Sequence, residues 1–133
     1  MKYLSEIMEK KQNNLFKKNK VFFAFSNEGF KKGMKENNIS KDTKMVSVGQ
    51  GMVCPSDNLK EVIDQLDIIY KESIKKDMKQ GKDRVILREL QNHECFYVGN
   101  ITDCVSKLED YPITREEIVK VYNENYQRIT SKY

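Results

Sequence analysis

Apolar residues recur at helical spacing along much of the chain. The longest such pattern predicts a helix that begins after Pro55–Asp57, a segment that can end a strand and cap a helix. Gln80–Gly81 ends this helix, and another is expected from Asp83 to about Asn92. The apolar positions of the long helix are Leu59, Val62, Ile63, Leu66, Ile69, Tyr70 and Ile74.

Four further helices are expected. The last has the clearest start signal, because Thr114 and Glu117 form a capping box while Ile113 and Ile118 occupy the positions of a hydrophobic staple. The second helix along the chain, which contains Phe30 and Met34, also has Gly29 and Gly33 one turn apart. These glycines predict a thin helix face that lies close to a neighbouring element. The other three ranges are Tyr3 to about Lys18, Ser26–Asn27 to Asn37–Asn38, and Thr102–Asp103, as a cap, to about Leu108.

Three segments predict strands. Val21–Phe25 is a continuous apolar run of strand length, expected as a central strand covered on both faces. Met45–Val48 and Met52–Cys54 flank Gly49–Gly51, which predicts a hairpin. Cys95–Val98 is a candidate for a short edge strand. The expected fold is α+β, a small, mainly antiparallel sheet packed by four to six helices, in a single domain over residues 1–133.

Charge and hydropathy limit the classes of function. The net charge is +4, and residues 1–44 hold eleven Lys against five acidic residues. Only four of the 24 basic residues are Arg, which weakens a nucleic-acid interpretation because Arg makes the bidentate contacts to phosphate and guanine. No apolar run approaches the roughly 20 residues that cross a bilayer, so a cytoplasmic protein without membrane contact is expected.

The segment Leu90–Cys104 holds most of the residues that could carry chemistry. Thiolate and imidazole suit zinc, so one alternative is a metal site. Its ligands would be His93, Cys95 and Cys104, with Cys54 as a further ligand. Structural zinc sites usually present two close ligand pairs, and this chain offers only His-x-Cys. Buried, reduced cysteines explain the pattern better, so no metal and no cofactor are predicted.

A thiol nucleophile is the second chemical alternative, with Cys95 activated by His93. The sequence supplies no third orienting group or oxyanion hole, and a histidine at a helix end commonly caps it. His93–Glu94 is not followed by the second histidine of a zinc-protease motif. Gly49–Gly51 lacks the Lys-Ser/Thr of a phosphate loop. No catalytic residue is therefore assigned.

Basic residues form two groups along the sequence, one in the N-terminal third and one between Lys71 and Arg84. They could neutralise phosphates or meet an acidic protein surface, although interleaved acids also fit an ordinary solvated face. Aromatic or arginine anchors would supply the affinity. The candidate binding residues are Lys71, Lys75, Lys76, Lys79, Arg84, Arg88 and Tyr97, with Tyr111, Tyr122 and Tyr126 as further aromatic candidates.

Three segments carry a family resemblance: VFFAFSNEGFKKGM, KMVSVGQGMVCP and LQNHECFYVGNITDCVSKLEDYPITREEIVKVYNE. Together they resemble a family of small, functionally uncharacterised proteins found in bacteriophages and other bacterial mobile elements. The FFAFS-type strand and the NHECFY-type segment are the most specific parts. The resemblance implies a phage accessory gene, a class that often encodes inhibitors of host immunity, including anti-CRISPR proteins that bind the effector or its guide. It carries over no site residue.

The functional expectation is therefore a non-enzymatic accessory protein in the host cytoplasm. It would inhibit a bacterial defence system by binding that system's protein or ribonucleoprotein complex. Two alternatives stay open. One is a nucleic-acid-binding phage protein that acts through its lysine-rich faces, and the other is a thiol or zinc-dependent enzyme centred on His93 and Cys95.

Overall fold

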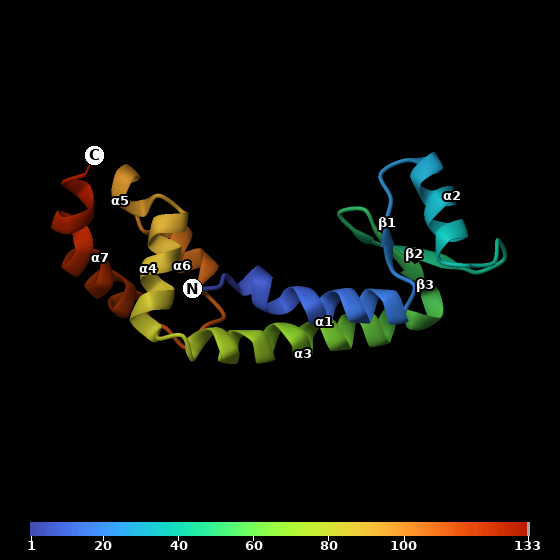
Figure 1. The fold of residues 1–133 in the computed structure, drawn as a ribbon, viewed down its shortest axis with the longest axis horizontal. Helices are drawn as coiled ribbons and strands as arrows, with labels where there is room; N and C mark the ends of the chain where they lie inside the picture. The colour runs from blue at the N-terminus through green and yellow to red at the C-terminus, as the bar shows by residue number, and fades with distance from the viewer. Residues whose placement is uncertain (133) are drawn as a thin grey trace. The chain divides into compact units, whose positions relative to one another are not determined.

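The computed structural model describes residues 1–132, which form seven α-helices and a three-stranded sheet (Figure 1). This confirms the α+β class, with one helix more than expected. The contacts divide the chain into two compact units. We call Tyr3–Ser73 the sheet unit, and Met1–Lys2 together with the chain from Ile74 onward the helical unit. The boundary falls within one helix, and the expectation of a single domain stays a prediction.

The sheet unit contains an antiparallel sheet of strand order β1-β3-β2. The expected hairpin is confirmed: Gly49, Gln50 and Gly51 all have positive φ, at 96°, 51° and 82°, and join β2 to β3. The elements are α1 (Leu4–Lys18), β1 (Phe22–Phe23), α2 (Asn27–Glu36), β2 (Met45–Gly49), β3 (Met52–Pro55), a 3₁₀ turn (Ser56–Asn58) and α3 (Leu59–Met78).

The prediction that Val21–Phe25 is a central strand is wrong. Only Phe22 and Phe23 form a strand, which pairs with β3 alone and lies at the edge of the sheet. Phe23 is 51% exposed and Phe25 is 84% exposed. An apolar run shows that a segment can be buried on both faces, but it does not show that neighbours exist to cover both.

The core of the sheet unit depends on how α1 ends. Lys20 has φ 57°, the left-handed conformation, and its amide donates to the Lys17 carbonyl at 3.4 Å. The Val21 amide donates to the Phe16 carbonyl at 2.8 Å, which completes a Schellman motif. This turn carries Val21 into the core. The buried cluster is Val21, Cys54 and Val62, against which Phe16, Val46, Met52, Leu59 and Leu66 pack.

The helical unit contains the end of α3 followed by four helices. The capping box is confirmed, because Thr114 Oγ1 accepts from the Glu117 amide at 3.2 Å and Glu117 Oε1 accepts from the Thr114 amide at 2.8 Å. The rings of Phe96 and Tyr122 stack with centroids 4.9 Å apart. The helices are α4 (Lys82–Asn92), α5 (Cys95–Val98), α6 (Thr102–Lys107) and α7 (Arg115–Thr130).

The prediction of an edge strand at Cys95–Val98 is also wrong, since this segment is one helical turn. Its first two residues are buried while Tyr97 and Val98 are exposed, whereas a strand would alternate faces. Left-handed residues flank the turn, Glu94 at φ 54° and Gly99 at φ 69°.

Thr102 is the first residue of α6 and does not cap it. Instead, Asn100 Oδ1 accepts hydrogen bonds from the Thr102 amide at 2.8 Å and from the Thr102 hydroxyl at 2.5 Å. Among the described helices, none combines the length and apolarity that crossing a membrane requires.

Candidate functional site

The predicted lysines of α3 lie on its exposed face. Lys71 forms an ion pair with Asp67 at 2.8 Å. In the described part of the chain, the other predicted basic residues that are exposed have no acidic partner within 4.0 Å. These four residues, which we call the cationic surface, are Lys75, Lys76, Lys79 and Arg84.

The spacing of these lysines explains why they share a face. Lys75 and Lys79 are one helical turn apart, and Lys76 follows Lys75 by about 100° around the axis. The opposite face of this turn carries the buried residues Ser73 and Asp77. Lys75 and Lys76 lie in the last turn of α3, where a cation also interacts favourably with the helix dipole. Part of their role is therefore structural.

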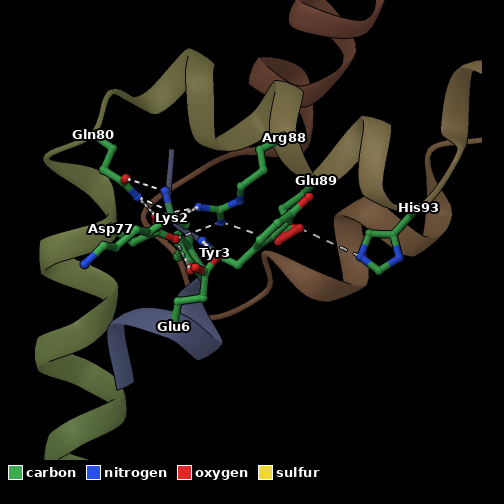
Figure 2. Close-up of polar contacts among 9 residues, drawn as sticks. Lys2, Tyr3, Glu6, Asp77, Gln80, Arg88, Glu89 and His93 are labelled. Atoms are coloured by element: carbon green, nitrogen blue, oxygen red, sulfur yellow. Dashed lines mark hydrogen bonds and ion pairs between the residues drawn. The ribbon is translucent and has the colours of Figure 1, made fainter. Parts of the chain in front are cut away.

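Arg88 is not part of this surface. It is 8% exposed, and its guanidinium forms a bidentate pair with Asp77, with Nη1 to Oδ1 at 2.7 Å and Nη2 to Oδ2 at 2.8 Å (Figure 2). A surface contact needs an exposed guanidinium, so the structure removes Arg88 from the predicted anchors. Tyr97, by contrast, is 71% exposed on α5, and it fits the exposed position that an anchor requires.

The Asp77 carboxylate is the centre of a buried polar cluster in the helical unit. Besides Arg88, it accepts from the Tyr111 hydroxyl at 2.5 Å and from Gln80 Nε2 at 2.6 Å. Burial by itself would raise the pKa of Asp77, but the hydrogen bonds from Arg88 and Tyr111 outweigh it and hold that pKa below its ordinary value. Burial and the adjacent carboxylate raise the pKa of the Tyr111 hydroxyl.

The start of the chain is hydrogen-bonded to the same cluster. The Lys2 carbonyl accepts from Arg88 Nη1 at 2.8 Å and from Gln80 Nε2 at 3.0 Å, and the Lys2 amide donates to Gln80 Oε1 at 3.0 Å (Figure 2). A carboxylate engaged by this many donors is a weak proton acceptor. We therefore interpret the Asp77 cluster as a structural element that ties four segments of the helical unit together, since its members come from the start of the chain, the end of α3, α4 and the segment before α7.

Glu89 and His93 extend this cluster along α4. Glu89 is 2% exposed, with Oε1 at 3.4 Å from Arg88 Nη2 and Oε2 at 4.0 Å from His93 Nε2 (Figure 2). Neither Glu89 Oε2 nor His93 Nε2 has a hydrogen-bond partner within the described residues. His93 occupies the C-cap position of α4, where its backbone amide donates to the Glu89 carbonyl. A capping role for its side chain stays a prediction.

The three cysteines are buried thiols. Cys54 lies in the sheet unit, whereas Cys95 and Cys104 lie in the helical unit, and all three side chains are fully buried. Burial raises the pKa of each thiol, for Cys104 to about 12. A protonated, inaccessible thiol is a poor nucleophile. Over residues 1–132, no group of three or more His, Cys, Asp or Glu side chains could hold a metal ion.

Sequence reasoning missed the role of Asp77, although a signal was present. Asp77 continues a stripe on α3 formed by Val62, the partly buried Leu66, Ile69 and Ser73, at spacings of three or four. A charged residue on such a stripe predicts a buried partner of opposite charge. Arg88 is that partner.

Comparison with known proteins gives one match. The curated proteins and the solved structures contain no match to this chain. The family described as "Family of unknown function (DUF7659)" matches residues 4–128, which is nearly the whole sequence. The chain therefore belongs to the family of unknown function DUF7659.

Proposed function

We propose that this chain is a non-catalytic, phage-encoded binding protein that inhibits a bacterial defence system by occupying its protein or ribonucleoprotein complex. The observation that carries the proposal is the cationic surface of Lys75, Lys76, Lys79 and Arg84, whose charges have no acidic partner in the described chain. The thiols and the Asp77 carboxylate, which could carry covalent or acid-base chemistry, are buried.

An uncompensated cationic face suits a defence complex for an electrostatic reason. Effector complexes that hold a guide nucleic acid present phosphates and acidic side chains. Opposite charge speeds encounter and selects orientation, while a few buried anchors supply most of the affinity. Tyr97 provides such an anchor within the same unit.

The test is a phage-protection assay in bacteria that carry an active CRISPR system directed against the phage. Expression of the chain should restore plaque formation, and the Lys75→Glu/Lys79→Glu variant should lose this effect. Lys10→Glu/Lys17→Glu is the control, because it reverses two exposed charges on α1. Unchanged immunity with a folded, expressed chain, across CRISPR and other defence systems, contradicts the proposal.

The same surface also favours a second function, direct nucleic-acid binding. Two lysines in the last turn of α3 and a third directly after it can neutralise phosphates without reading sequence. In that case, binding to random duplex should fall steeply between low and high salt, and Lys75→Glu/Lys79→Glu should reduce the salt slope by about 2. A chain that binds no duplex at low salt excludes this function.

A further inference from the structure

A second surface feature is a groove in the sheet unit. It is lined by residues of α2 and of the loop that follows this helix, whose course Figure 1 shows. Its volume is about 690 Å³, within the range of sites that bind a ligand or a few large side chains. Its lining combines an apolar floor with a rim of lysines. We call it the α2 groove, lined by Phe30, Lys31, Met34, Lys35, Ile39 and Lys41.

One glycine, Gly33, allows α2 to pack closely against the sheet. A Cβ at Gly33 would clash with the ring of Phe22, so this ring lies directly on the helix backbone. Phe22 also contacts Phe30, with ring centroids 5.9 Å apart. These contacts confirm the thin glycine face expected from the sequence. They hold α2 against β1 and position Phe30 at the groove.

The end of α2 supplies the rest of the floor. Asn38 has φ 54°, and its amide donates to the Lys35 carbonyl at 3.1 Å. The Ile39 amide donates to the Met34 carbonyl at 2.9 Å, the second bond of a Schellman motif. This motif brings the residue after the turn back to the last turn of the helix. Ile39 and Met34 therefore line one groove, although the helix ends between them.

The lysines of the groove lack counter-charges. Lys31, Lys35 and Lys41 have no acidic partner within 4.0 Å in the described chain, and no acidic residue lines the groove. Lys32, on the same helix but outside the groove, pairs with Glu36 at 3.8 Å. Positive charge is therefore uncompensated around the apolar floor.

We propose that the α2 groove binds an acidic, amphipathic segment of a partner protein. Apolar side chains of the segment would cover Phe30, Met34 and Ile39, and its carboxylates would pair with the lysines. The argument is charge complementarity combined with an open floor. Each of the three floor residues keeps part of its surface exposed. A fatty acyl chain on this open floor would leave its outer side in contact with water. An amphipathic segment covers the floor with its apolar face and presents its polar face to water.

This proposal rests on the proposed function, since the α2 groove would be one surface by which the chain binds its partner protein. The test is a display selection of random peptides, about four helical turns long, against the full chain. Enriched peptides should be acidic, with large apolar residues at helical spacing. An enriched peptide should bind Lys31→Glu/Lys35→Glu at least about tenfold more weakly than the unmodified chain.

The control is Lys10→Glu/Lys17→Glu, which reverses two exposed lysines on α1, outside the groove. It should leave peptide binding within about twofold. A Met34→Ser variant should also weaken binding, because charge alone is not the basis of the site. Circular dichroism checks that each variant is folded.

The groove proposal is overturned by no enrichment, by enrichment of neutral or basic peptides, by equal loss of peptide binding in both charge variants, or by a fatty acid that binds the chain when no acidic peptide does. The phage-protection assay separates it from the proposed function. If peptide binding follows the groove but no immunity is blocked, only the defence proposal fails. If immunity is blocked equally by Lys31→Glu/Lys35→Glu and the unmodified chain, only the groove proposal fails.

Discussion

The two units of this chain both expose charges, but among the described residues only the helical unit also buries them. The helical unit buries Asp77, Arg88 and Glu89 among its helices, where Asp77 and Arg88 form a bidentate pair. The core cluster of the sheet unit is apolar, built on Val21 and Val62, and its charges lie outside. A buried pair cannot reach a partner protein, whereas an exposed lysine without a counter-ion can. The comparison therefore separates charges that specify the fold from charges available for recognition.

This difference predicts unequal costs of substitution. Removing one member of a buried pair leaves an uncompensated charge in a low-dielectric environment. Removing one member of an exposed pair changes little, because water screens both charges.

The largest effect is expected for Asp77→Asn. The amide keeps the shape of the carboxyl but leaves the Arg88 guanidinium buried without its counter-charge. We expect a loss of about 3–5 kcal/mol in the free energy of unfolding, measured by urea denaturation. Hydrogen exchange should accelerate more in α4 to α7 than in the hairpin of β2 and β3.

The pH dependence of stability is an independent test of the Asp77–Arg88 pair. Because the folded-state pKa of Asp77 is lowered, its stabilising contribution is fully present above the unfolded pKa, about 3.9, and is lost as pH falls through the folded value. The stability gap between the unmodified chain and Asp77→Asn should therefore narrow below about pH 4. Glu124→Gln, at an exposed ion pair with Lys120, should behave like the unmodified chain. A gap that does not change with pH contradicts this account.

An intermediate effect is expected for Gly33→Ala. Alanine favours a helix interior by up to about 1 kcal/mol, yet its Cβ would enter the Phe22 ring. We expect a net loss of about 1–3 kcal/mol in the free energy of unfolding, together with weaker peptide binding to the α2 groove. Calorimetry and binding measurements check the two effects.

Phe22→Leu supplies the matched partner for a double-mutant cycle. The double variant should lose less stability than the sum of the two single losses, because the smaller side chain relieves the clash. Additive losses would show that Phe22 is not what constrains Gly33.

The smallest effect is expected for Lys20→Gly, at the left-handed residue that ends α1. Glycine adopts positive φ without the Cβ penalty, so we expect a gain of about 0.5–1 kcal/mol in the free energy of unfolding. Lys20→Ala keeps the Cβ and should bring no gain. If alanine stabilises the fold as much as glycine does, backbone strain at this position is not the cause.

Local signals in the sequence predicted the helices and the hairpin. Thr114 and Glu117 predict the start of α7 because their hydrogen bonds span only three residues. Gly49 and Gly51 predict the hairpin turn because two of its three positive-φ positions are glycines. The sequence predicts less well which strands pair and which short segments are helical. The apolar run at Val21–Phe25 carries no information on which strand it joins, and four apolar residues at Cys95–Val98 are too few to distinguish a helical period from a strand.

The candidate sites were predicted in part. The lysines of α3 were singled out, and the structure places them on an exposed face. Arg88 was grouped with them because residue type alone does not report burial. In the α2 groove, Ile39 and Lys41 could not be linked to Phe30, since only the Schellman turn after Met34 brings them together.

The hydrogen bonds of Lys2 have a consequence for how the chain folds during synthesis. The sheet unit is one continuous segment, Tyr3–Ser73, so its internal contacts can form as soon as that segment has left the ribosome. Lys2 must wait for Gln80 and Arg88, which are translated 78 and 86 residues later. Lys2 therefore finds its partners only after the whole sheet unit has been made, although it precedes that unit in the sequence.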